Sequence, residues 1–142
     1  MKQDGMASPS RPARILVVDD ERHIARFLVF VLTGVGYEAQ AVYDGEEALA
    51  AVKSFEPDGI LLDLLLPKLS GKEVLCRLRA DPALSGLKIL MLTGCPVQED
   101  DVANPLSSGA DAYCVKPIGP SALIGILRQH GLTPRVEKEA AT

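Results

Sequence analysis

The sequence predicts a single α/β domain with a five-stranded parallel sheet and helices on both faces. Short apolar segments rich in branched residues alternate five times with segments whose apolar residues recur at helical spacing. The apolar segments are continuous, which is typical of strands that are buried on both faces of a parallel sheet. Right-handed crossovers between successive strands would place the connecting helices on both sides of that sheet.

The first half of the chain contains three of the predicted strands. In chain order the segments are a strand at 14–18, a helix at 21–33, a strand at 37–43, a helix at 45–55 and a strand at 58–63. Gly34 and Gly36 can end the first helix, because glycine tolerates the left-handed backbone found at helix C-termini. Asp44 precedes the second helix and can cap its free amides. Pro57 then interrupts the chain before the third strand.

The second half continues the alternation and includes one irregular segment. In chain order it contains a helix at 72–80, a strand at 88–93, a strand within 111–117 and a helix at 121–130. Ser70 and Glu73 have the spacing of a capping box, and Pro120 occupies a tolerated first-turn position. The fourth helix of the series is expected within 97–109, where Pro105 would remove a backbone hydrogen bond. We therefore predict that the fourth helix is short or irregular.

Length and composition fit one globular domain. The chain has 142 residues, of which 47% are hydrophobic and 24% are charged. We expect a disordered extension at 1–12, the domain at 13–131 and a polar tail at 132–142, so an output domain or downstream partner would be separate. The sequence shows neither a secretory signal nor an apolar stretch long enough to span a membrane.

Charge and cysteine content narrow the expected partners and location. The net charge is −4 and the isoelectric point is about 5.1. Domains that bind nucleic acid usually carry a basic face, so we expect no direct nucleic-acid contact. Cys76, Cys95 and Cys114 form no CxxC pair and lack a histidine at metal-ligand spacing. Reduced thiols of this kind predict a cytoplasmic protein.

Polar side chains follow four of the five predicted strands at the point where each strand ends. Asp19 and Asp20 follow the first strand, Asp63 ends the third, Thr93 ends the fourth and Lys116 follows the fifth. The carboxyl ends of parallel strands lie at one edge of the sheet, where ligands of open α/β sheets bind. We expect these five side chains to share one site.

The chemistry of this residue set predicts a magnesium site with a nucleophilic carboxylate. Asp63 lies in the apolar run LLDLLLP, where an unpaired charge would be costly to bury. Three carboxylates, one Mg²⁺ and one lysine sum to zero charge, and oxygen ligands suit Mg²⁺. A carboxylate can attack an activated phosphoryl group, and a metal and a lysine can neutralise the transferring oxygens.

The motifs VVDDE, LLDLLLPKLSG, MLTG and GADAYCVKP together resemble the receiver domain of bacterial two-component response regulators. The resemblance covers about residues 13–130, and the motifs occur in the order and spacing of that family. It implies a doubly wound, flavodoxin-like fold with strand order 2-1-3-4-5. It further implies a protein that is switched by phosphorylation and is not an enzyme acting on separate substrates.

The resemblance assigns Asp63 as the phosphoryl acceptor and implies an Mg²⁺ site around it, in which Mn²⁺ can substitute. Asp20 corresponds to a direct metal ligand, and Asp19 corresponds to a residue that acts largely through water. The backbone carbonyl of Leu65 corresponds to a further ligand. The donor would be the phosphohistidine of a sensor histidine kinase or a phosphotransfer protein.

Three further positions correspond to residues that respond to the phosphoryl group. Thr93 matches the switch hydroxyl, Lys116 matches the lysine that binds the phosphoryl group, and Tyr113 matches the aromatic residue that turns inward on activation. The resemblance also implies a cis peptide bond between Lys116 and Pro117. A downstream protein or an output domain would read the resulting conformational change.

Other interpretations of the same residues remain open. The fold could serve as a protein-interaction module that is not phosphorylated. A phosphatase-like hydrolase is less consistent, because such enzymes have a second aspartate where LLDLLLP has leucine. Neither GxGxxG nor a Walker lysine motif follows the first strand, which disfavours nucleotide binding. Three arginines outside the motifs, Arg22, Arg26 and Arg79, are expected to be solvated.

Overall fold

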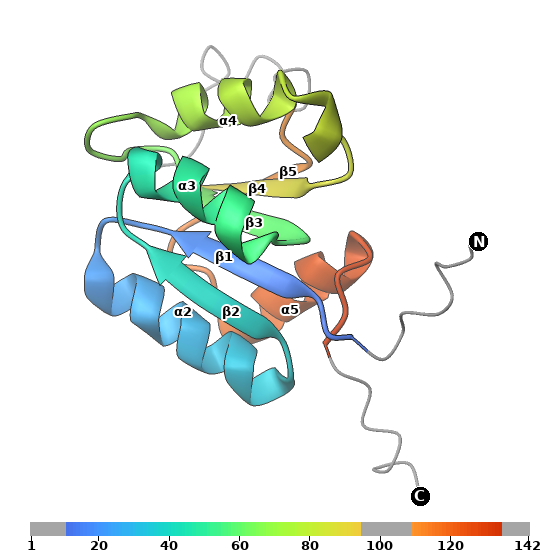
Figure 1. The fold of residues 1–142 in the computed structure, drawn as a ribbon. Helices are drawn as coiled ribbons and strands as arrows, with labels where there is room; N and C mark the ends of the chain where they lie inside the picture. The colour runs from blue at the N-terminus through green and yellow to red at the C-terminus, as the bar shows by residue number, and fades with distance from the viewer. Residues whose placement is uncertain (1–10, 95–108, 135–142) are drawn as a thin grey trace, which may run out of the picture.

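The computed structural model describes residues 11–94 and 109–134, and it contains the predicted parallel sheet. The strands are β1 (Arg14–Val18), β2 (Glu38–Val42), β3 (Gly59–Asp63), β4 (Lys88–Thr93) and β5 (Ala112–Val115). Their spatial order is β2-β1-β3-β4-β5, and all four strand pairs are parallel (Figure 1). The strand order therefore reverses between β1 and β3, as the flavodoxin-like fold requires.

Helices cover both faces of the sheet. They are α2 (Arg22–Val35), α3 (Gly45–Phe55), α4 (Gly71–Arg79) and α5 (Pro120–Gln129), with a 3₁₀ turn, η2, at Pro82–Leu84. In Figure 1, α3 and α4 lie on one face of the sheet and α2 and α5 on the other. The fold class predicted from the sequence is confirmed, whereas the irregular helix expected within 97–109 falls, except for Gly109, outside the described residues.

Two apolar cores fill the space between the sheet and these helices. One core joins α3 and α4 to side chains on alternate positions of the central strands, such as Leu16, Ile60 and Leu62. The other joins α2 and α5 to the intervening positions, such as Ile15 and Leu61. Successive strand residues point to opposite faces, so a continuous apolar strand supplies both cores.

The helix ends follow the predicted capping residues. Asp44 precedes α3, and its side chain accepts a hydrogen bond from the Glu47 amide, which lowers the pKa of Asp44. Ser70 caps α4 by accepting a hydrogen bond from the Glu73 amide. Gly36 ends α2 with a φ of 117°, a left-handed conformation that glycine adopts at little cost. These caps fix where each helix begins or ends relative to the sheet edge.

The edge of the sheet where the strands begin is held by residues from both ends of the described chain. The Ala13 amide donates to the Thr133 carbonyl, and the Tyr37 hydroxyl donates to the Leu132 carbonyl over 2.6 Å. Leu132 is buried, and its side chain lies close to Gly59. Packing therefore continues past the end of α5.

The expectation that Arg79 is solvated is wrong. Its guanidinium is partly buried and donates to the Asp111 carboxylate over 2.8 Å. It also donates to the backbone carbonyls of Gly109, Leu87 and Leu84. Arg22 is exposed, as expected, and its guanidinium lies 3.9 Å from the centre of the Tyr43 ring. Arg79 thus connects the end of α4 to the segments around β4 and β5.

Candidate functional site

The predicted carboxylates meet at the edge of the sheet where the strands end. Asp19 and Asp20 follow β1, Asp63 ends β3, and carboxylate oxygens of the three residues lie within 4.8 Å of one another. Asp19 and Asp63 are buried, with 0% and 5% of their surfaces exposed, whereas Asp20 is exposed. The reversal of strand order places the β1 and β3 ends side by side, so residues far apart in sequence form one cluster.

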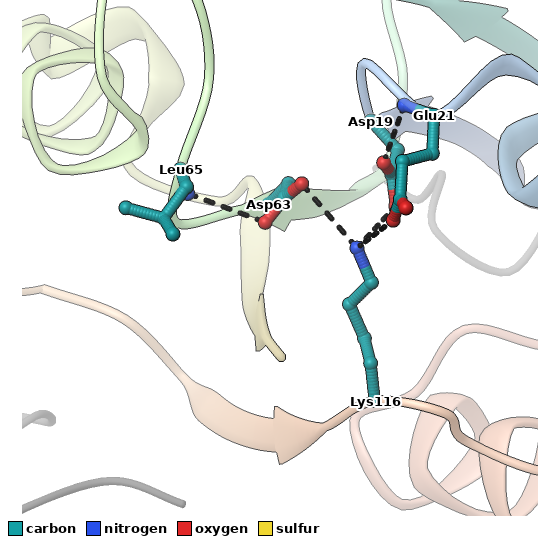
Figure 2. Close-up of polar contacts among 5 residues, drawn as sticks. All are labelled: Asp19, Glu21, Asp63, Leu65 and Lys116. Atoms are coloured by element: carbon teal, nitrogen blue, oxygen red, sulfur yellow. Dashed lines mark hydrogen bonds and ion pairs between the residues drawn. The ribbon is translucent and has the colours of Figure 1, made fainter. Parts of the chain in front are cut away.

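Lys116 brings a positive charge into this cluster from beyond the end of β5. Its Nζ lies 2.9 Å from Asp19 Oδ2 and 3.4 Å from Asp63 Oδ2 (Figure 2). The Lys116 amide donates to the Thr93 carbonyl, which fixes the backbone before the side chain turns toward the carboxylates. The Lys116–Pro117 peptide bond is cis, as the resemblance implies.

A fourth carboxylate, that of Glu21, also reaches Lys116 and was not singled out from the sequence. Glu21 Oε1 lies 3.3 Å from Lys116 Nζ, and the Glu21 amide donates to Asp19 Oδ1 over 2.9 Å. Both Asp19 and Glu21 therefore face Lys116 from the same loop, as Figure 2 shows. The available signal was its position directly after the two aspartates in VVDDE.

Burial and charge crowding change the acidity of Asp63. Burial has the largest effect and Asp19 adds to it, so that together they raise the Asp63 pKa to about 6 despite the opposing effect of Lys116. Burial alone would lower the pKa of Lys116, but its hydrogen bond to Asp19 and the charges of Asp63 and Asp19 hold that pKa above the usual value. Lys116 therefore stays charged, while its positive charge does not fully offset the burial of Asp63 and the repulsion from Asp19.

The loop after β3 fixes the second oxygen of Asp63. The Leu65 amide donates to Asp63 Oδ1 over 3.2 Å, while Leu65 as a residue is 72% exposed and its side chain points away from the carboxylates in Figure 2. The Leu64 amide donates to the Leu92 carbonyl, which ties the loop to β4. A Cβ on Gly71 would come within 2.2 Å of the Asp63 carbonyl, so only glycine permits this approach of α4.

The structure places Thr93 and Tyr113 on the two strands beyond β3. Thr93 ends β4 and is 5% exposed, beside the strand that ends in Asp63. Tyr113 lies on β5, is partly buried and packs against the core formed with α3 and α4. The switching roles that the resemblance gives to these two residues stay predictions.

The donor set suits a hard divalent cation. Three carboxylates lie close enough to supply one oxygen each, and no histidine or thiolate belongs to the cluster among the described residues. Oxygen ligands of this kind favour Mg²⁺, Mn²⁺ or Ca²⁺ over metals that prefer nitrogen or sulfur. The residues present therefore fit the cation that the sequence predicts.

A cavity of about 450 Å³ opens beside the carboxylate cluster. It runs between α2 and the segment after β5, with Glu21, Lys116 and Pro117 at the site and Phe27 and Ile118 further out. Most of its lining is apolar, and Phe27 is 51% exposed.

Among the described helices, none is long and apolar enough to span a membrane.

Comparison with known proteins agrees with this geometry. Residues 15–128 match the family described as the response regulator receiver domain. The chain belongs to this family. It is therefore a receiver domain of the two-component signalling class, and its cluster of aspartates and lysine lies at the site that the sequence predicts.

Individual relatives support the same assignment. The chain is 45% identical over 115 residues to the DNA-binding response regulator MtrA of Mycobacterium tuberculosis and to that of Mycobacterium leprae. These matches cover 81% of the chain but 49% of each relative. The chain thus spans about half the length of these curated relatives.

Solved structures match over nearly their whole length. The chemotaxis response regulator CheY4 of Vibrio cholerae has a TM-score of 0.77 at 30% identity, covering 84% of this chain and 98% of that one. The receiver domain of the Francisella response regulator 1452 has a TM-score of 0.75 at 28% identity, covering 83% and 95%. Both similarities extend over the sheet and its helices.

Proposed function

We propose that Asp63 accepts a phosphoryl group from the phosphohistidine of a sensor histidine kinase or a phosphotransfer protein. The observation that carries the proposal is a buried carboxylate 3.4 Å from a lysine and within 4.8 Å of two further carboxylates. An Asp63 oxygen attacks phosphorus, the bond from phosphorus to the imidazole nitrogen breaks, and the imidazole leaves with the electron pair.

Asp20, Asp63 and the Leu65 carbonyl would hold Mg²⁺, or Mn²⁺ in its place. When bound, the cation supplies positive charge that stabilises the oxygens of the transferring group. Both oxygens of Asp19 already accept hydrogen bonds, from the Glu21 amide and from Lys116. This arrangement supports a role for Asp19 through water instead of direct coordination.

Lys116 and Thr93 would bind the phosphoryl oxygens once Asp63 is modified. The Lys116 ammonium is charged and its backbone is fixed by Thr93, so it can turn from Asp19 toward the new anion with little rearrangement. Thr93 and the partly buried Tyr113 would then carry the change to the surface around β5. The modification shifts an equilibrium between existing conformations.

We propose that the domain acts as a cytoplasmic switch and not as an enzyme that turns over separate substrates. The mostly apolar cavity beside Lys116 would give a partner protein a contact surface next to the site. MtrA is described as DNA-binding, and the chain matches about half of it. For this domain, with its net charge of −4, we propose protein contacts and a separate output domain or partner.

Exposure to acetyl phosphate and Mg²⁺, followed by intact mass measurement, tests the proposal. The native protein should gain the mass of one phosphoryl group, and Asp63→Asn should gain none. Asp81→Asn, at an exposed carboxylate outside the site, provides a control for loss of a different carboxylate, because asparagine keeps its capping role. An unchanged native mass would support a module that is not phosphorylated, and multiple turnover of a phosphate ester would support a hydrolase.

A further inference from the structure

The side chain of Glu21 is positioned to act on Lys116. Glu21 precedes α2 at the position where a short polar residue usually caps the helix, yet among the described residues its side chain makes no such capping bond. It extends instead to Lys116 Nζ at 3.3 Å, across 95 residues of sequence. The Asp19 carboxylate fixes the Glu21 amide, so the loop directs this side chain toward the site.

The contacts of Lys116 are divided between two sides of the site. Asp19 and Glu21, at 2.9 and 3.3 Å, lie on the loop after β1, whereas Asp63, at 3.4 Å, lies at the end of β3. A phosphoryl group on Asp63 would require Lys116 to turn toward the β3 side. Among these three carboxylates, Glu21 is neither the proposed acceptor nor a proposed metal-site residue.

The charge balance of the site also indicates a role for Glu21. Asp19, Asp20, Asp63 and Glu21 carry four negative charges, so one divalent cation and Lys116 leave the site with one uncompensated negative charge. An incoming phosphoryl donor is itself an anion and is repelled by that excess. The same excess attracts a cation, so Glu21 should affect cations and anions in opposite directions.

We propose that Glu21 is a positioning residue that holds Lys116 on the β1 side and disfavours phosphorylation by small anionic donors. This inference rests on the proposed phosphorylation of Asp63. With acetyl phosphate, an Asp63 oxygen attacks phosphorus and acetate leaves with the electrons of the broken bond. Glu21 slows that step by competing with the transferring oxygens for the ammonium, which contacts both Glu21 and Asp63. A protein donor, which covers the site, is affected less.

The experiment compares the full chain with Glu21→Gln, Glu21→Ser and Glu56→Gln. Serine is a favourable helix cap, which protects folding of α2. Glu56 is exposed beyond α3 at the opposite edge of the sheet, and its variant makes the same charge change away from the site. Calorimetry measures Mg²⁺ affinity alone and then beryllofluoride affinity at saturating Mg²⁺, and mass spectrometry measures the rate with acetyl phosphate.

Both Glu21 variants should bind Mg²⁺ roughly threefold more weakly than the native protein. They should bind beryllofluoride roughly threefold more tightly and react with acetyl phosphate roughly threefold faster. These ratios should shrink toward one as salt approaches ~1 M, where screening is strong. The inference about Glu21 is overturned if both variants have the same affinities and rate as the native protein, or if both affinities shift in one direction. The proposed phosphorylation of Asp63 would survive either result. If the native protein neither binds beryllofluoride nor gains mass, the proposed function fails with it.

Discussion

Two partly buried cations among the described residues have opposite surroundings. The Arg79 guanidinium meets one carboxylate, that of Asp111, and three backbone carbonyls, so its donors and charge are matched. The Lys116 ammonium meets the carboxylates of Asp19, Glu21 and Asp63, so negative charge exceeds positive charge around it. The first arrangement stabilises one structure, whereas the second leaves excess negative charge that the proposed cation would balance.

Removing the matched cation should give the largest change in stability. Arg79→Ala should lower the free energy of unfolding by about 2–3 kcal/mol, because Asp111 and several carbonyls would lose their donor. Arg77→Ala, which removes an exposed pair with Glu73, should cost less than about 0.5 kcal/mol. Urea unfolding measures both, and equal losses would remove the contrast between the two arginines.

Removing a negative charge from the carboxylate cluster should stabilise the protein, whereas removing Arg79 destabilises it. At pH 7 and without metal, Asp63→Asn should raise the free energy of unfolding by about 1–2 kcal/mol. The folded protein raises the Asp63 pKa from 3.8 to about 6, so within that pH range the folded state binds more protons than the unfolded state. The native protein should therefore lose stability relative to the variant as the pH rises from about 4 to 6.

Unfolding of the metal-free native protein and Asp63→Asn across this pH range measures that difference. Asp58→Asn is the control, since Asp58 pairs with Arg11 at the opposite edge of the sheet. A variant that is less stable than the native protein at pH 7 would show that Lys116 fully compensates Asp63.

A divalent cation should also reduce the repulsion among the carboxylates around Lys116. The gain in the free energy of unfolding should be similar to that expected for Asp63→Asn. Mg²⁺ at ten times its dissociation constant should stabilise the native protein by about 1.4 kcal/mol. Asp20→Asn and Asp63→Asn should lose most of this gain, and Asp58→Asn should keep it. Thermal unfolding with and without Mg²⁺ provides the measurement. An equal gain in all four proteins would mean that the cation acts elsewhere.

The smallest effect is expected at a single buried hydrogen bond far from the site. Tyr37→Phe removes the hydroxyl that donates to the Leu132 carbonyl and should cost about 1 kcal/mol. Mg²⁺ affinity, measured by calorimetry, should not change. A change in Mg²⁺ affinity would show that the two edges of the sheet are energetically connected.

Local patterns in the sequence predicted the fold and the centre of the site for physical reasons. Continuous apolar runs mark strands buried on both faces, and the residue that ends each run must lie at the carboxyl edge of the sheet. The meeting of Asp19, Asp63 and Lys116 follows from topology alone. The caps formed by Asp44 and Ser70 follow from neighbours three residues away.

The interactions of Glu21 and Arg79 could not be predicted in this way. Both side chains are long, and each contacts groups from other elements. Glu21 and Lys116 are separated by 95 residues along the sequence, and Arg79 and Asp111 are separated by 32. Periodicity indicates which face of a helix is buried, but it does not indicate which distant carbonyl or lysine a flexible side chain contacts. The position of Leu65 was predictable, but the solvent exposure of its side chain was not.

We expect Lys116 to stay paired with Asp19 and Glu21 until a phosphoryl group forms on Asp63. A crystal structure with Mg²⁺ and beryllofluoride tests it most directly. We expect beryllofluoride on Asp63, the cation beside Asp20, and Lys116 Nζ moved from Asp19 and Glu21 to a fluorine atom. An unmodified Asp63 at saturating beryllofluoride, or a modified Asp63 with Lys116 still on Asp19 and Glu21, would contradict it.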